Sequence, residues 1–93
     1  MTLLFRDKFN RIIRLPNERI HHIGSHMDLK DKLYLIELTL LHPDSLLKDE
    51  DRVDIFYYQK YLKDKHLYFI IVVKVFNGEG LILTIFNNDK LQQ

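Results

Sequence analysis

The run from Leu67 to Phe76 constrains the fold more than any other part of this 93-residue sequence. It is apolar throughout except at Lys74, and it holds neither proline nor glycine. A short apolar run of this kind is typical of a central strand that is covered on both faces. The turn-forming sequence Asn-Gly-Glu-Gly follows at 77–80, and a second apolar run follows at 81–86. The sequence therefore predicts an antiparallel hairpin in the middle of a sheet.

The length of the loop in this hairpin decides which side chains share a face. A two-residue loop at 78–79 pairs Lys74 with Leu83 and places Thr84 on the other face. A three-residue loop at 78–80, with its last glycine left-handed, pairs Lys74 directly with Thr84. We expect the three-residue loop, in which Lys74 and Thr84 lie together.

Proline, aspartate and apolar spacing define the other predicted elements. Pro16 is suited to the first turn of a helix, and the residue before Pro43 is pushed out of the helical region. After Pro43 the apolar pattern changes to a period of two, which is typical of strands. The elements predicted outside the hairpin are a strand at 9–15, a helix from 16 to about 24–26, a helix at 32–41 with Asp28 as its N-cap, and strands at 45–48 and 53–58.

These elements predict an α+β fold in one domain spanning residues 1–93, with a frayed tail from about residue 88. Two N-terminal helices are expected to pack on an antiparallel sheet of four to five strands. The chain contains no cysteine, which excludes disulfides, thiolate nucleophiles and cysteine-ligated metals. Its longest uncharged apolar run is far shorter than the roughly 20 residues of a membrane helix, and no signal peptide is apparent. We therefore expect a cytoplasmic protein that does not enter membranes.

The formal net charge is only +1, but the charges are unevenly distributed. Basic residues outnumber acidic ones at 1–26, whereas the opposite holds at 27–51. Arg14 and Arg19 flank the predicted junction between the first strand and the first helix, where unpaired backbone N–H groups favour an anion. Since arginine binds phosphate through two parallel hydrogen bonds, both are candidate phosphate-binding residues. A mixed surface with no anion site is the alternative interpretation.

Glu18, His22 and His26 are spaced by four residues, which places them on one face of a continuous helix. The first interpretation is an exposed polar face. The second is a metal site, although the sequence between the histidines lacks the general-base glutamate of zinc peptidases. The third is acid–base catalysis, because imidazole titrates near neutral pH. We take His22 and His26 as catalytic candidates.

Four further side chains are candidates on the predicted strands. Lys74 either extends from the end of its strand toward solvent or neutralises phosphate charge in a cleft. Thr84 is either an ordinary strand residue or a phosphate or base contact. Tyr57 and Tyr58 are adjacent, so alternation directs one toward the core and the other outward. Either could pack across strands, stack on a base or donate a hydrogen bond to a phosphate.

A series of short motifs spans roughly residues 10–87. Their order resembles that of phage-associated BECR nuclease domains, the fold group of barnase, EndoU, colicin-type and RelE-like ribonucleases. In two places the sequence departs from the pattern: it has Ile85-Phe86 where the group tends to Ala-Tyr, and Met27-Asp28 in place of a proline pair. The motifs that carry the resemblance are Ile12-Ile13-Arg14-Leu15, Glu18-Arg19-Ile20-His21-His22-Ile23 followed by His26, Thr39-Leu40-Leu41-His42-Pro43-Asp44, Tyr57-Tyr58, Val72-Val73-Lys74 and Leu83-Thr84-Ile85-Phe86.

This resemblance implies an endoribonuclease that uses neither metal nor cofactor, acting as a toxin of a toxin–antitoxin or phage-linked system. The ribose 2′-hydroxyl would attack the adjacent phosphorus of an RNA substrate, and a cognate antitoxin would be the protein partner. His22 and His26 would then supply the acid and base, Arg19 and Lys74 would stabilise the phosphate, and Thr84 would contact phosphate or base.

Two alternatives stay open at this point. One is a non-catalytic module of the same fold that binds nucleic acid or protein through its basic or acidic region. The other is a metal-dependent nuclease that uses Glu18, His22 and His26 as ligands.

Overall fold

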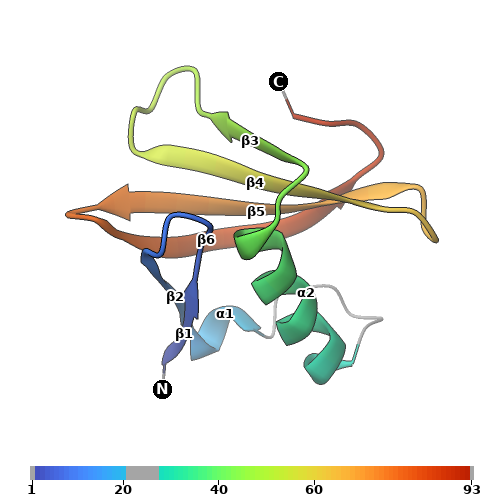
Figure 1. The fold of residues 1–93 in the computed structure, drawn as a ribbon, viewed down its shortest axis with the longest axis horizontal. Coiled ribbons are helices and arrows are strands. Elements are labelled where there is room, and N and C mark those ends of the chain that lie inside the picture. The colour runs from blue at the N-terminus through green and yellow to red at the C-terminus, as the bar shows by residue number, and fades with distance from the viewer. Residues whose placement is uncertain (1, 21–27, 93) are drawn as a thin grey trace.

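The computed structural model describes residues 2–20 and 28–92 of the chain. Within these residues the chain forms one six-stranded sheet and two helices (Figure 1). Neither helix has the length and apolar character that crossing a bilayer requires. The elements are, in chain order, β1 (Thr2–Arg6), β2 (Ile12–Pro16), α1 (Asn17–Ile20), α2 (Leu29–Leu41), β3 (Ser45–Lys48), β4 (Ile55–Leu62), β5 (Leu67–Phe76) and β6 (Glu79–Asn88).

The strands lie in the order β1-β2-β6-β5-β4-β3. All neighbouring pairs are antiparallel except β2 and β6, which run parallel through Ile13–Gly80 and Arg14–Leu81. This contact joins segments near the two ends of the chain. The N-terminal β-hairpin therefore extends the meander of the last four strands into one mixed sheet (Figure 1).

The predicted fold, two N-terminal helices on an antiparallel sheet of four to five strands, is wrong. The sheet is mixed and larger because β1, which the sequence analysis does not predict, pairs with β2, and β2 then pairs in parallel with β6. The described part of the first helix is limited to Asn17–Ile20. The strands predicted at 45–48 and 67–76 are confirmed, and α2 begins directly after Asp28, although that side chain makes no capping hydrogen bond.

The hydrophobic core lies between one face of the sheet and the two helices. Side chains alternate along each strand, so Phe69, Ile71 and Val73 of β5 face the helices while Ile70 and Val72 face the opposite side. Burying one large apolar side chain contributes about 1.5–3 kcal/mol. The other fully or nearly fully buried members of the core are Ile13, Leu15, Ile20, Leu35, Ile36, Leu40, Tyr58, Ile82 and Ile85.

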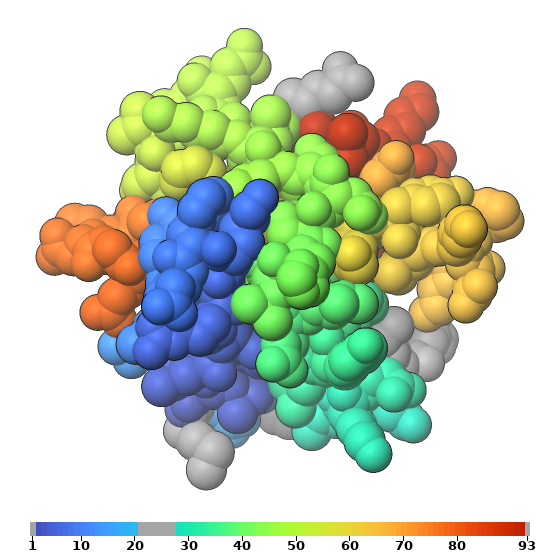
Figure 2. All heavy atoms as spheres, viewed as in Figure 1, coloured from blue at the N-terminus to red at the C-terminus, as the bar shows by residue number. Residues whose placement is uncertain are grey.

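The loop between β1 and β2 connects the N-terminal hairpin to the helical layer. The backbone N–H of Lys8 donates to the Leu40 carbonyl near the end of α2, at 2.9 Å. Figure 2 shows α2 and this hairpin side by side on the surface of the helical face. The hairpin is thus fixed both at its strand edge and at its loop.

The opposite face of the sheet is covered in part by the segment after β6. The backbone N–H of Gln92 donates to Gln59 Oε1 at 2.8 Å, and Gln59 Nε2 donates to the Gln92 carbonyl at 3.4 Å. Gln59 is fully buried as a result. This segment lies against β4 by two hydrogen bonds, whereas a frayed tail from about residue 88 was the sequence expectation.

The β5–β6 hairpin has a two-residue turn at Asn77 and Gly78, so the predicted three-residue loop is wrong. Both residues have positive φ, 53° and 76°, which is the conformation of a type I′ turn. Asparagine and glycine adopt it at low cost, and the turn pairs Phe76 with Glu79. A β-bulge further along the hairpin then changes the register of β6 against β5.

Candidate nucleic-acid interface

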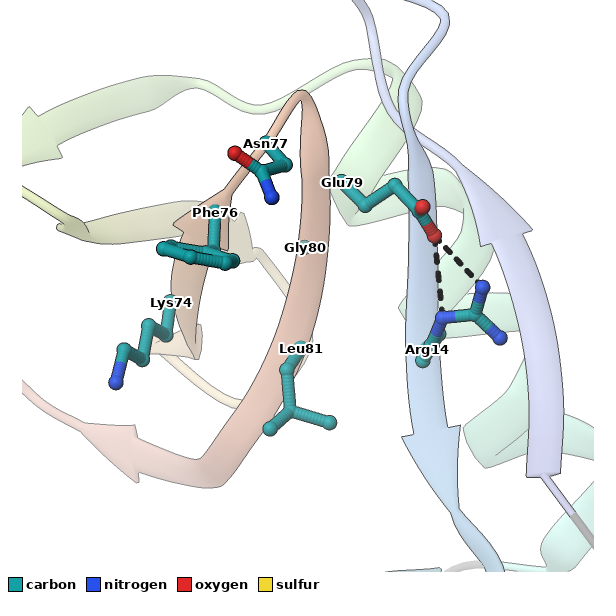
Figure 3. A pocket seen from close by; sticks show the side chains of 7 residues that line it. All are labelled: Arg14, Lys74, Phe76, Asn77, Glu79, Gly80 and Leu81. Carbon is teal, nitrogen blue, oxygen red and sulfur yellow. Dashed lines mark hydrogen bonds and ion pairs between the residues drawn. The ribbon is translucent and has the colours of Figure 1, made fainter.

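The face of the sheet opposite the helices carries two cationic side chains in one row across three strands. Arg14 of β2 is the register partner of Leu81 of β6, and Leu81 is also the partner of Lys74 of β5. Neighbouring strands lie about 4.8 Å apart, so roughly 10 Å separates the two cationic residues along this row. Their side chains line an open hollow of about 410 Å³, together with Phe76 and the end of the hairpin (Figure 3).

Each of these cations has a carboxylate nearby. Arg14 Nη2 lies 2.7 Å and Nε 3.2 Å from Glu79 Oε1, and Lys74 Nζ lies 3.9 Å from Asp54 Oδ2. The side chains of the first pair are 48% and 47% exposed, and those of the second are 43% and 27% exposed. Ion pairs this exposed contribute about 0–1 kcal/mol. Both cations can therefore exchange a carboxylate for a phosphate at little cost.

Thr84 lies on the same face as Lys74. The bulge leaves Leu83 without a partner on β5, so Thr84 pairs with Val72 and Ile82 pairs with Val73. The direct pairing of Lys74 with Thr84 expected from the sequence is wrong. Since Val72 and Lys74 are two residues apart on one strand, however, the exposed Thr84 still faces the side of the sheet that carries the cation.

Arg19 has a structural position. Its Nη1 donates to the carbonyl oxygens of Ile82 and Leu83, at 3.0 and 2.6 Å. The pairing of β2 with β6 ends at Arg14 and Leu81. The two carbonyls lie beyond that point, and the guanidinium satisfies them. Arg19 thus fixes α1 to the edge of β6, and the phosphate role that the resemblance implies for it stays a prediction.

Tyr58 lies in the core, which corrects its candidacy for RNA contact. Its side chain is fully buried, so the ring has no surface for a base. The hydroxyl donates to Asp7 Oδ2 at 2.5 Å and accepts from Arg11 Nη2 at 2.9 Å. Arg11 Nε in turn donates to the same carboxylate oxygen at 2.9 Å. The three side chains form a closed network between β4 and the β1–β2 loop.

The Asp7 carboxylate also organises that loop. Its Oδ1 accepts from the backbone N–H groups of Phe9 and Arg11, both at 2.9 Å. Burial by itself raises the pKa of Asp7, but the hydrogen bonds from Tyr58 and Arg11 outweigh it and hold the pKa below its ordinary value of 3.8. Burial and the bond to the carboxylate raise the pKa of Tyr58. The carboxylate is thus ionised and the phenol neutral at physiological pH.

Tyr57 points away from the helices and Tyr58 points toward them, as the predicted alternation of the two tyrosines requires. Its hydroxyl donates to Asp49 Oδ1 at 2.5 Å, and this bond raises the pKa of Tyr57. The tyrosine lines a separate hollow with Gln92 and the acidic loop at 49–51. An acidic surrounding is unfavourable for RNA, so Tyr57 is not part of the row formed by Arg14 and Lys74.

The two catalytic histidine candidates, His22 and His26, lie outside the described residues. Glu18 is exposed on α1. Among residues 2–20 and 28–92, no three histidine, aspartate or glutamate side chains lie close enough together to hold a metal ion. The metal set considered from the sequence includes both histidines and is not tested by this arrangement.

Comparison of the chain with models of protein families, with curated proteins and with solved structures finds no match. The resemblance to BECR nuclease domains thus depends on the motifs of this sequence alone.

Two residues with clear structural or surface roles are absent from the sequence-based candidates. Asp7 stands between Arg6 and Lys8 like an ordinary surface charge, and only the fold reveals that Tyr58 reaches it. Phe76 ends an apolar run and is expected to be buried, yet it is 70% exposed in the hollow. Its place as the last residue before the Asn-Gly turn is the signal that could have indicated this, because strand ends at a tight turn extend beyond the core.

Proposed function

We propose that the protein is a metal-independent endoribonuclease that binds RNA on the face of the sheet opposite its helices. The row formed by Arg14, Leu81 and Lys74 in the open hollow is the observation that carries this proposal. The two cations come from strands, which hold them at a fixed separation suited to neighbouring parts of a polyanion. The described helices, α1 and α2, lie on the other face of the sheet, so an extended chain has access to this hollow (Figure 3).

The chemistry of the proposal is attack of a ribose 2′-hydroxyl on the adjacent phosphorus. The bond to the 5′-oxygen breaks, and a cyclic phosphate is left. Charge that develops on the phosphate oxygens is stabilised by Arg14, whose planar guanidinium matches two of them, and by Lys74. The resemblance assigns the proton transfers to His22 and His26, and the Thr84 hydroxyl would donate a hydrogen bond to the phosphate or the base.

The resemblance also supplies the biological context of the proposal. It implies a toxin of a toxin–antitoxin or phage-linked system, with a cognate antitoxin as the partner. We propose that the enzyme acts in the cytoplasm, where RNA is available and where a cysteine-free chain loses nothing to the reducing conditions.

Cleavage of a labelled RNA oligonucleotide, with and without EDTA, tests the proposal. We expect chelator-resistant cleavage that is lost in Lys74→Ala and His26→Ala. Lys30→Ala, which removes an exposed lysine from α2 on the helical layer, is the matched control and is expected to cleave normally. Cleavage that EDTA abolishes would instead support the metal-dependent nuclease. Binding without cleavage would support the non-catalytic module.

Binding measurements test the role of Arg14 separately from cleavage. Glu79→Gln removes the carboxylate that pairs with Arg14, so we expect RNA affinity to rise by about two- to fivefold. Lys74→Ala is expected to lower the salt dependence of binding by about 0.7 in the slope of log K against log salt, as for one phosphate contact on a single strand. Unchanged RNA affinity in Arg14→Ala would exclude Arg14 from the phosphate site.

A further inference from the structure

Phe76 is a large apolar side chain at the end of a rigid strand, and it is 70% exposed. One exposed phenylalanine is common on protein surfaces and needs no explanation by itself. The position of this one is specific. It is the last residue of β5, held by the hydrogen-bonded pairing with Glu79 and followed directly by the type I′ turn. Its backbone is therefore fixed while its ring is available to solvent.

The ring lies beside both cationic residues. Phe76 and Lys74 are two residues apart on β5 and so face the same side, and Arg14 approaches from β2 through its bond to Glu79. All of these side chains line the same hollow, with the Phe76 ring beside Lys74 and the Asn77 amide at the tip of the hairpin (Figure 3). An aromatic face and two separated cations thus occur within one small surface.

We propose that Phe76 is the base-stacking residue of this surface, so that the RNA it takes is single-stranded with one unpaired base on the ring. This inference rests on the proposed function and adds its substrate class. Arg14 and Lys74 hold the phosphates on either side, and the ring contacts the face of the base between them. The pairing of cations with an exposed ring favours a polynucleotide over an acidic peptide, because only the nucleotide supplies a flat π-face with each charge.

An unpaired base is required by the geometry of stacking. In a duplex both faces of each internal base are covered by its neighbours, so a protein ring reaches only bases that are unstacked. The ring projects from a hairpin tip and not from a closed pocket, which suits a base in a flexible strand. A stacking contact is tolerant of sequence, because every base has a π-face.

The test uses a single-stranded oligouridylate of roughly eight nucleotides, an abasic ribose-phosphate oligomer of equal length and an RNA duplex, with direct binding measurements. We expect Phe76→Ala to weaken binding of the oligouridylate by about 5- to 150-fold and to leave binding of the abasic oligomer nearly unchanged. Tyr34→Ala is the matched control, because Tyr34 is an aromatic side chain 65% exposed on α2 in the other layer. The wild-type protein is expected to prefer the oligouridylate to the duplex.

A second variant keeps the inference testable should Phe76→Ala fold poorly. The chain contains no tryptophan, so Phe76→Trp introduces a single fluorescent reporter at the site. We expect the oligouridylate to quench its fluorescence and the abasic oligomer to bind without quenching. Absence of quenching, or equal losses for both ligands in Phe76→Ala, would overturn the stacking role. If the wild-type protein binds neither the oligouridylate nor the abasic oligomer, the proposed function itself fails. If Phe76→Ala binds both ligands as tightly as the wild-type protein does, only the stacking role of Phe76 fails.

Discussion

Replacing Tyr58 by phenylalanine removes one hydroxyl from the interior and keeps the ring that packs in the core. The hydroxyl donates to the buried carboxylate of Asp7 at 2.5 Å and accepts from Arg11 Nη2 at 2.9 Å. The Asp7 side chain is fully buried, so no solvent replaces the lost donor on Oδ2. The Arg11 side chain is 22% exposed and can bind water instead. The main loss therefore falls on the carboxylate.

The size of the loss follows from the charge of the acceptor. A hydrogen bond to a charged group contributes about 1.5–3 kcal/mol, and an unsatisfied buried group costs about as much again when nothing replaces its partner. Asp7 keeps its bonds from Arg11 Nε and from two backbone N–H groups. The further penalty for an unsatisfied group therefore does not apply, and the loss stays within the contribution of the hydrogen bond itself. We expect Tyr58→Phe to lower the free energy of unfolding by about 2–3 kcal/mol. In a domain of this size the Tm would fall by about 8–20 °C.

Urea and thermal unfolding followed by circular dichroism measure this change. Tyr57→Phe is the control, because it removes a tyrosine–aspartate hydrogen bond of the same length, 2.5 Å, from the neighbouring residue on the other face of the sheet. Asp49 receives two further backbone N–H bonds in an exposed loop, so this control is expected to lose less than half as much stability. Equal losses in the two variants would refute the reasoning that burial of the carboxylate sets the cost.

Three further outcomes are expected. Gly80→Ala places a Cβ 2.5 Å from Ile13 Cδ1, so we expect about 1–3 kcal/mol of destabilisation in urea, and wild-type stability would contradict the close approach of β2 to β6. Arg19→Met leaves the Ile82 and Leu83 carbonyls at the β6 bulge without this donor, so we expect a lower Tm and an unchanged RNA affinity of the folded protein. A loss of RNA affinity without a loss of stability would instead support a phosphate role for Arg19. The pKa of Asp7 is lowered in the folded state, so the ionised carboxylate contributes stability above pH 3.8 and loses that contribution as the pH falls below this value. The unfolding curves of the wild-type protein and Asp7→Asn should therefore converge on acidification.

Secondary-structure elements that depend only on neighbouring residues could be predicted from the sequence. The apolar run at 67–76 predicted the central strand, and the turn-forming sequence at 77–80 predicted the hairpin, although not its two-residue turn at Asn77 and Gly78. β1 was missed because a short alternating segment at 2–6 has no signal without its partner strand. The parallel contact of β2 with β6 depends on residues far apart in sequence, so no local pattern indicates it.

The candidate site divides in the same way. Lys74 stood out because a cation interrupts an apolar run, and the structure places it in an open hollow with Arg14. The role of Arg19 could not be read from the sequence, since the bulge carbonyls it binds are backbone atoms and Leu83 is an ordinary strand residue. Alternation predicted that one of the two adjacent tyrosines faces the core, but not that Tyr58 would bind a carboxylate from the first loop.

The parallel pairing of β2 with β6 also determines when this chain can complete its fold during translation. The β1–β2 hairpin leaves the ribosome before its partner β6, which follows the other five described strands in the chain. Until then the edge of β2 at Ile13 and Arg14 has no partner strand, and closing the contact requires all the residues between β2 and β6 to be synthesised. A nascent chain therefore holds the β1–β2 hairpin without its sheet partner, accessible to chaperones and proteases, until β6 has left the ribosome.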